Sequence, residues 1–174
     1  DIYLCLADFV RPLHSGIKDK VGIFATTVDA KLEVLYPDDT YKHMLAQTLA
    51  DRLAEATAEK LHEQVRQRIW GYAPDEKLSM KQLHNEEFQG IRPAVGYPSL
   101  PDQSVNFLLD ELLDMKIIGI RLTENGMMQP HASVSGLMLA HPASRYFSIG
   151  RIDESQLKDY ASRRSLTIEE MRKF

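Results

Sequence analysis

The chain has little cysteine: Cys5 is its single one, which excludes an internal disulfide and a cysteine-rich metal site. It lacks an apolar run near the ~20 residues needed to span a membrane, and it shows no signal-peptide pattern. It also lacks a basic excess, because 21 Lys and Arg against 25 Asp and Glu give a net charge of −4. Bulk nucleic-acid binding would leave a strongly basic footprint. We therefore predict a cytoplasmic protein with neither membrane nor nucleic acid as a partner.

Several catalytic and metal-binding motifs are missing as well. The sequence contains no Gly-x-Gly-x-x-Gly, no Walker loop and no Gly-x-Ser-x-Gly elbow, so Rossmann-type, P-loop and serine-hydrolase chemistry are disfavoured. The six histidines are scattered without the paired spacing of zinc sites. We predict no catalytic side chain and no metal ligand in this chain.

What is present fits one globular domain. A length of 174 residues, with 44% hydrophobic and 26% charged residues, is ordinary for a single domain with a real core. No linker or repeat divides it, so residues 1–174 are predicted to form one domain. Residues 1–6 begin inside a strand-like pattern, and the last residues stop within a helical pattern.

The first half is dominated by one long predicted helix. The apolar, β-branched segment 21–28 predicts a buried strand. Asp39 then offers a helix start, strong helix formers fill the segment to Trp70, and Gly71 stands where a C-terminal cap belongs. We predict one continuous helix from about Asp39 to Trp70.

Apolar residues in this helix recur at intervals of four, with Thr57 in the same row: Leu45, Leu49, Leu53, Leu61, Val65 and Ile69. Each step of four drifts by ~40°, so the row winds around the helix. The row therefore predicts a central helix covered on different sides at its two ends, and a cost of ~2–5 kcal/mol for Leu53→Ala.

Shorter elements fill the second half. Helices are predicted at 77–85, at 103–116, from Asp153, and after the Thr167 capping box; strands are predicted at 118–122, 132–140 and 146–149. Successive short strands favour an antiparallel sheet. The predicted fold class is α+β, a mainly antiparallel sheet flanked by helices, with the long helix at its centre.

The segment from Arg92 to Pro98 combines rigid backbone with side chains that recognise ligands. Proline fixes φ and glycine permits close approach, so this loop can hold two groups in one geometry. Arg92 offers a planar fork of donors for a carboxylate, and Tyr97 offers a π-face for a cation. The pair predicts a zwitterionic ligand.

Asp51 and Glu55 are carboxylates one helical turn apart, with Glu59 a further turn along. Like charges at this spacing cost a few tenths of a kcal/mol when solvated. Two interpretations remain open. The carboxylates form a solvated acidic face relieved by Arg52 and Lys60, or a negative wall that faces a cationic ligand.

Ordered phrases along most of the chain resemble the S-adenosylmethionine-binding activation domain of cobalamin-dependent methionine synthase. They are Cys5–Val10, Leu49–Ala56, Trp70–Pro74, Gln89–Pro98, Leu122–Glu124, Ala132–Gly136, His141–Phe147 and Asp159–Ala161. So many phrases in order are far more specific than one motif. The family's domain extends well upstream, and this chain resembles its C-terminal half or slightly more.

The resemblance implies a ligand site. By this resemblance, Arg92 matches the arginine that binds the carboxylate of S-adenosylmethionine, and Ala94 belongs to the same motif. Tyr97 matches the tyrosine that lies beside the sulfonium and its methyl. The remaining matches are the aromatic pair around the adenosine and three carboxylates near the ligand: Tyr146, Phe147, Asp51, Glu55 and Glu86. The family's upstream part contributes a further ligand contact.

The resemblance also implies a function. Such a domain supports the reductive methylation of inactive cob(II)alamin to methylcobalamin, with a methyl from S-adenosylmethionine and an electron from flavodoxin or a similar donor. Cobalamin is held by another domain of the same enzyme, which is a partner, and zinc belongs only to a further domain.

Two alternatives differ in class. The chain could be a non-catalytic module that docks on the cobalamin domain or on flavodoxin, which calorimetry with S-adenosylmethionine would separate from a ligand-binding domain. It could also be a stand-alone reactivator of a separate corrinoid protein. The presence or absence of homocysteine-, folate- and cobalamin-binding domains in the same gene distinguishes that case.

Overall fold

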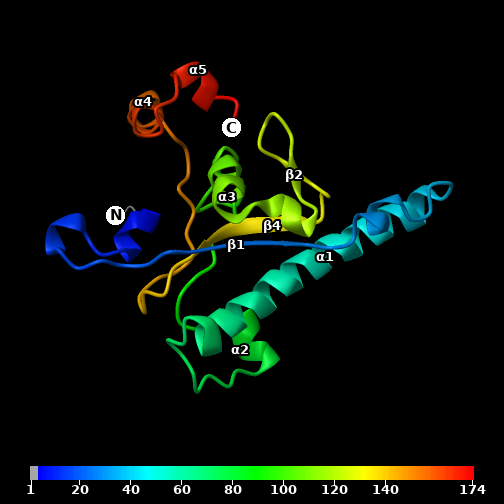
Figure 1. The fold of residues 1–174 in the computed structure, drawn as a ribbon, viewed down its shortest axis with the longest axis horizontal. Helices are drawn as coiled ribbons and strands as arrows, with labels where there is room; N and C mark the ends of the chain where they lie inside the picture. Colours follow the sequence, from blue (N-terminus) through cyan, green and yellow to red (C-terminus); the bar gives the residue numbers. More distant parts are fainter. Residues whose placement is uncertain (1–3) are drawn as a thin grey trace.

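The computed structural model describes residues 4–174 (Figure 1). The helices are α1 (Thr40–Gln64), α2 (Met80–His84), α3 (Val105–Leu113), α4 (Glu154–Arg163) and α5 (Ile168–Met171). The strands are β1 (Gly22–Thr27), β2 (Arg121–Leu122), β3 (Met128–Gln129) and β4 (Ser133–Met138). In Figure 1 the long α1 runs beside the β1–β4 pair, and α4 and α5 lie with the C-terminus on the opposite side.

The β1–β4 pair is the central layer. The two strands are antiparallel, with Ile23 opposite Leu137 and Phe24 opposite Gly136. Successive side chains of a strand point to opposite faces. Phe24 packs with Ala58 of α1, whereas Ile23 and Leu137 pack against the cluster that contains Val105 and Leu109 of α3. Helix α1 therefore covers one face of the pair, and α3 covers the other.

The α+β class and the antiparallel pairing are confirmed, with differences at individual strands. The predicted strands at 21–28 and 132–140 correspond to β1 and β4, and that at 118–122 shortens to β2, which pairs with the unpredicted β3. The strand predicted at 146–149 is wrong, since these described residues have no ladder and their aromatic side chains pack instead on Phe9. For the strand-like segment 1–6, residues 1–3 lie outside the described range, and a 3-10 turn covers Leu6–Phe9.

The extent of the long helix is confirmed. The Asp39 side chain caps α1 by accepting from the Lys42 backbone N–H at 3.0 Å. The helix continues from Gln64 into a π-helical turn, Val65–Ile69, and ends at Gly71, whose φ of 72° suits glycine. Side-chain caps likewise begin α2, α4 and α5, from Ser79, Asp153 and Thr167. Helix α3 is shorter than predicted because Asp114 turns left-handed.

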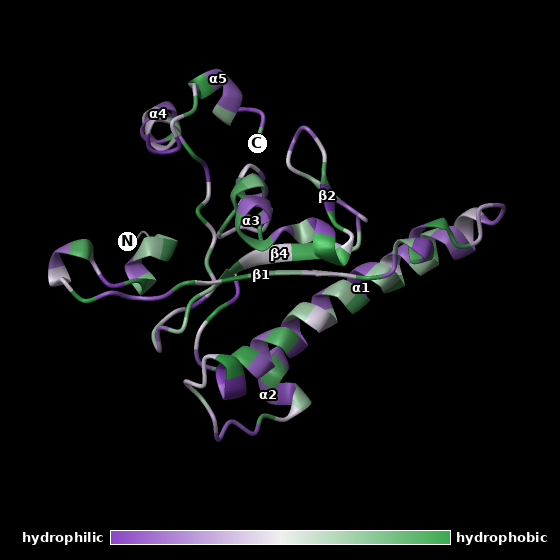
Figure 2. Cartoon of the chain, in the orientation of Figure 1, coloured by the Kyte–Doolittle hydropathy of each residue, from purple (hydrophilic) through white to green (hydrophobic). Residues whose placement is uncertain are grey.

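The predicted packing face of α1 is wrong at Leu49 and Leu53, whereas Leu61 and Val65 of the same row pack against the cluster that contains Phe24. Leu49 and Leu53 are 60% and 52% exposed, and the residues buried at intervals of four lie one position further along: Ala50, Ala54, Ala58, His62 and Arg66. Small side chains allow α1 to approach the sheet so closely that the hydroxyl of Thr26 donates to the Ala54 carbonyl at 3.3 Å. Figure 2 shows hydrophobic and hydrophilic residues interleaved along α1, so hydropathy alone does not mark the buried face.

This packing changes the expected response to substitution. Because Leu53 is half exposed, Leu53→Ala should lower the free energy of unfolding by less than about 1 kcal/mol. Ala54 is fully buried against β1, so Ala54→Leu should overpack the contact and cost about 1–3 kcal/mol. Urea denaturation of both variants measures the two costs. A larger loss for Leu53→Ala than for Ala54→Leu would show that the leucine row, and not the alanine row, packs in the core.

No helix of the described range is both long and apolar enough to cross a membrane.

Candidate functional site

The segment that carries Arg92 adds to the edge of β4. The Val95 backbone N–H donates to the Ser135 carbonyl at 2.9 Å, and the Leu137 N–H donates to the Pro93 carbonyl at 3.0 Å. Side chains along this extended segment alternate, so Val95 is buried while Arg92 faces the open side. Backbone hydrogen bonds to the central layer thus fix the position of the segment that carries Arg92.

Gly136 makes this close pairing possible. A Cβ at this position would lie 2.3 Å from the Pro93 carbonyl oxygen and 2.9 Å from the Ala94 Cα. Both neighbours are backbone atoms, which cannot move aside as a side chain can. Only glycine therefore fits between β4 and the segment bearing Arg92.

A cleft of about 800 Å³ opens between this segment, α1 and the chain around Tyr146. Its lining includes seven of the eight predicted site residues: Glu55, Glu86, Arg92, Ala94, Tyr97, Tyr146 and Phe147. The eighth, Asp51, lines an adjoining pocket of about 230 Å³ that shares Arg52, Glu55 and Tyr97 with the cleft. Clefts of this size suit small-molecule ligands.

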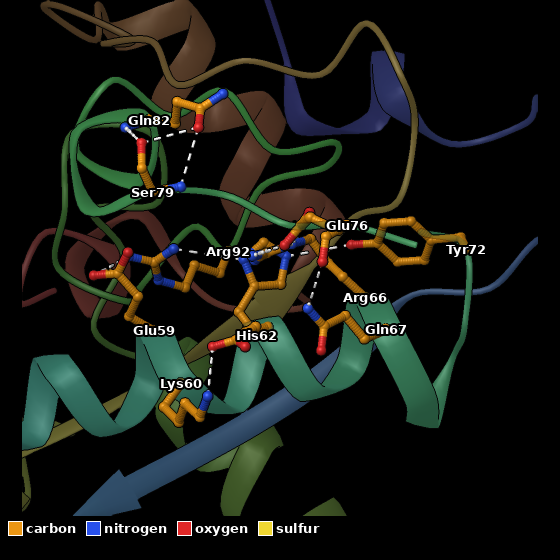
Figure 3. Close-up of polar contacts among 11 residues, drawn as sticks. Glu59, Lys60, His62, Arg66, Gln67, Tyr72, Glu76, Ser79, Gln82 and Arg92 are labelled. Carbon is orange, nitrogen blue, oxygen red and sulfur yellow. Dashed lines mark hydrogen bonds and ion pairs between the residues drawn. The ribbon is translucent and has the colours of Figure 1, made fainter. Parts of the chain in front are cut away.

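Arg92 is held from several sides (Figure 3). Its Nη2 lies 3.7 Å from an oxygen of Glu59, its Nη1 lies 3.5 Å from Nδ1 of His62, and its guanidinium lies 5.6 Å from the centre of the Phe88 ring. Its backbone N–H donates to the hydroxyl of Tyr146 at 3.0 Å. The guanidinium is partly exposed, so it retains donors for a ligand.

Tyr97 and Glu55 form a pair across the cleft. The phenol donates to the Glu55 carboxylate at 2.6 Å, and Glu55 also pairs with Arg52 at 2.7 Å. The hydrogen bond to Glu55, together with partial burial, raises the pKa of Tyr97 to about 12. The phenol therefore keeps its proton at neutral pH, and its ring is held at the boundary between the two pockets.

Tyr146 and Phe147 reach the cleft from an irregular segment. Both pack against the buried cluster of Phe9, Ile91 and Leu139. Burial raises the pKa of Tyr146 above its ordinary value. The aromatic pair thus joins the N-terminal part of the chain to the cleft wall.

The acidic residues are divided between the two pockets. Glu55 and Glu86 line the cleft, and Asp51 lies 3.3 Å from Nδ1 of His131 in the adjoining pocket. Glu86 has a left-handed φ of 55°, which a non-glycine residue adopts at a cost and which often marks a functional position.

Three further residues at the cleft were not predicted as ligand-site residues: Glu59 and Arg52 were placed only in the charged face of the long helix, and His62 was one of the scattered histidines. Glu59 pairs with Arg92, Arg52 pairs with Glu55, and the buried His62 contacts the Arg92 guanidinium. The sequence signal for them is their spacing on α1, where positions 52, 55, 59 and 62 recur at threes and fours and so share one face. The sequence did not reveal toward which segment that face points.

Within residues 4–174, the His, Cys, Asp and Glu side chains form no group of three that could hold a metal ion.

The structure is thus an α+β fold with a cleft whose lining combines carboxylates, guanidiniums and aromatic rings. A family model described as "Vitamin B12 dependent methionine synthase, activation domain" matches residues 1–165. The chain belongs to this family of activation domains, as the resemblance in its sequence implied.

A solved structure agrees with this assignment. The chain is similar, with 45% sequence identity and a TM-score of 0.88, to a crystal structure of the MetH reactivation domain bound to AdoHcy. The similarity covers 97% of this chain and 54% of that chain, so the present chain spans about half the length of its relative.

Proposed function

We propose that this domain binds S-adenosylmethionine in the 800 Å³ cleft and presents its methyl group for the reductive methylation of cob(II)alamin in a cobalamin-dependent methionine synthase. The observation that carries the proposal is the convergence of Arg92, Tyr97 and Glu55 on one cleft in a chain of this family. The relative in the crystal structure holds AdoHcy, the product that remains when S-adenosylmethionine loses its methyl.

The charges of the cleft suit such a ligand. Three carboxylates and two guanidiniums line it, which leaves one net negative charge: Glu55, Glu59, Glu86, Arg52 and Arg92. S-adenosylmethionine carries one net positive charge, from its ammonium, sulfonium and carboxylate groups. Complementary charge favours capture and orientation of the ligand. In this proposal Arg92 binds the carboxylate, Ala94 offers backbone beside it, and Tyr146 and Phe147 flank the adenosine.

Tyr97 and the acidic residues act on the sulfonium without transferring a proton. The protonated phenol ring stabilises a nearby cation through its π-face, and Glu55 fixes the ring. Cobalamin held by a neighbouring domain, with one electron from the donor protein, would supply the cobalt that takes the methyl, and S-adenosylhomocysteine would leave as the neutral thioether. Positive charge disappears from sulfur in this step, so the acidic groups, including Asp51, should bind that charge only modestly. The chain's principal contribution is to position the reactants.

The wider setting is part of the proposal. The cobalamin-binding domain of the same enzyme is the partner that meets the mouth of the cleft, and flavodoxin or a similar protein supplies the electron. Zinc belongs to another domain of that enzyme. A cytoplasmic location is part of the same proposal, and the single cysteine is in keeping with a reducing compartment.

Arg92→Ala tests the ligand assignment. A charge-assisted contact to a carboxylate contributes about 1.5–3 kcal/mol, so the variant should bind S-adenosylmethionine roughly 10- to 150-fold more weakly. Arg92→Lys should also bind weakly, because an ammonium cannot replace the bidentate fork. Isothermal titration calorimetry measures both, and Arg163→Ala, at an exposed surface position, is the control.

Unchanged affinity in Arg92→Ala would contradict the assignment. If the 174-residue chain binds no S-adenosylmethionine while a longer form containing the upstream part does, the site is shared with that part. If neither form binds, the docking-module alternative is favoured.

A further inference from the structure

His62 lies directly beneath the recognition loop. It projects from α1, has no exposed surface, and meets the Phe88 ring edge-on at 5.4 Å. Nδ1 of its ring lies 3.5 Å from Nη1 of Arg92, and Nε2 lies 3.3 Å from the hydroxyl of Tyr72. Figure 3 shows Arg92 between Glu59 and His62, with Tyr72 beyond the histidine.

The chemistry of the neighbours determines where the ring proton resides. A guanidinium only donates hydrogen bonds, so Nδ1 of His62 must accept from Arg92. A neutral imidazole has a single N–H, which is then on Nε2 and donates to the Tyr72 hydroxyl. Arg92 therefore selects the tautomer, and the Tyr72 hydroxyl accepts the resulting Nε2–H and holds the ring in place.

The surroundings also keep the ring neutral. Burial, reinforced by the positive charges of Arg66 and Arg92, lowers the pKa of His62 to about 3. Protonation would place a third cation beside two guanidiniums that already contact the Phe88 ring, at 4.5 and 5.6 Å. At neutral pH the imidazole is thus an uncharged hydrogen-bond acceptor.

We propose that His62 is a positioning residue for ligand recognition: it holds one edge of the Arg92 guanidinium, in an orientation set by Tyr72, so that the remaining donors meet the ligand carboxylate. The inference rests on the proposed function, since it concerns the same site. It adds a second layer, the buried His62 and the partly buried Tyr72, behind the residue that would touch the ligand.

A neutral acceptor suits this task better than a carboxylate. A buried carboxylate in place of His62 would form a close ion pair with Arg92 and compete with the ligand for its donors. Glu59, the acidic neighbour of Arg92, stays 3.7 Å away and is partly exposed, so its attraction is weaker. His62 restrains the guanidinium while its full charge remains available.

Binding of two ligands to the same variant distinguishes a loss of Arg92 positioning from general damage to the cleft. S-adenosylhomocysteine carries the carboxylate, whereas 5′-methylthioadenosine has the adenosine and sulfur but lacks the amino-acid portion. In His62→Leu, the affinity for S-adenosylhomocysteine should fall roughly tenfold, the order that one hydrogen bond to a charged group contributes. The affinity for 5′-methylthioadenosine should stay within about twofold, because its contacts do not involve Arg92.

His62→Asn provides the rescue. Its Oδ1, like Nδ1 of histidine, is bonded to Cγ and can accept from Arg92, so most of the affinity for S-adenosylhomocysteine should return. Tyr72→Phe, a milder change, should weaken binding of the same ligand a few-fold, because it removes the acceptor that holds the Nε2–H of His62. Together these variants keep the inference testable if His62→Leu does not fold.

A double-mutant cycle completes the test. In an Arg92→Ala background, His62→Leu should cause no further loss of S-adenosylhomocysteine affinity, since it acts through the missing guanidinium. Equal losses for both ligands, or additive losses in the cycle, would overturn the positioning role and leave His62 a structural residue. If neither the 174-residue chain nor the longer form containing the upstream part binds either ligand, the proposed function fails, and the role of His62 fails with it.

Discussion

Glu76→Ala is expected to lower the free energy of unfolding by about 3–5 kcal/mol, the cost of leaving a buried charge without its partner. Arg66 is completely buried, and Nε and Nη2 of its guanidinium donate to the Glu76 carboxylate at 2.6–3.0 Å. The third nitrogen, Nη1, has no hydrogen-bond partner among the described residues, so nothing nearby replaces the lost carboxylate. Urea denaturation followed by circular dichroism measures the loss.

Two further variants test whether the loss comes from the unpaired buried charge. Asp159→Ala removes a pair with Arg163 that is largely exposed on both sides, so it should cost no more than about 1 kcal/mol. The double variant Arg66→Met/Glu76→Leu should recover most of the stability, because apolar residues often replace a buried ion pair without loss. A cost below about 1 kcal/mol for Glu76→Ala would show that the Arg66 charge is solvated.

Gly136→Ala is expected to damage both stability and ligand binding. The new Cβ would lie 2.3 Å from the Pro93 carbonyl oxygen, and relief requires that β4 separate from the segment bearing Arg92. Overpacking against backbone should cost about 3 kcal/mol, near the upper end of the usual range. Displacement of Arg92 and Tyr97 should lower S-adenosylmethionine affinity at least tenfold, since small misplacements in a site have large effects.

Gly16→Ala separates this effect from the conformational preference of glycine. Gly16 has a φ of 67°, and a Cβ added there would meet no described atom within 4 Å, so alanine should cost about 1–2 kcal/mol through backbone strain alone. Its ligand affinity should remain that of the wild type. If Gly136→Ala binds and unfolds like the wild type, the contact between β4 and the Arg92 segment is looser than described.

The start and end of the long helix could be predicted because the signals are local. Asp39 caps the first turn and Gly71 adopts a left-handed φ, and both act within a few residues of themselves. The buried face could not be predicted, because a helix that lies close to a sheet buries small residues such as Ala54 and leaves larger ones such as Leu53 outside. Hydropathy ranks these residues in the opposite order.

The same distinction applies to the site. Arg92, Pro93, Gly96 and Tyr97 lie in one short segment, so the sequence could predict that Arg92 and Tyr97 lie close together, and both line the cleft. Their role in ligand recognition stays a prediction. The part played by His62 depends on a contact 30 residues away in sequence, and a lone histidine in a helix carries no local sign of its partner. The aromatic residues at 146–149 suggested a strand, since aromatic side chains are common in strands. The prediction was wrong because these side chains pack on Phe9, a contact that is equally non-local.

The pairing of β1 with β4 also determines when the cleft can exist during synthesis. Thr26 and Val134, partners in this pair, are 108 residues apart, so the ribosome must release most of the chain before the central layer can close. Helix α1 depends on local hydrogen bonds and can form earlier. The segment bearing Arg92 has no strand to join until β4 emerges, and a nascent chain interrupted before Ser133 would therefore contain the long helix without any binding site.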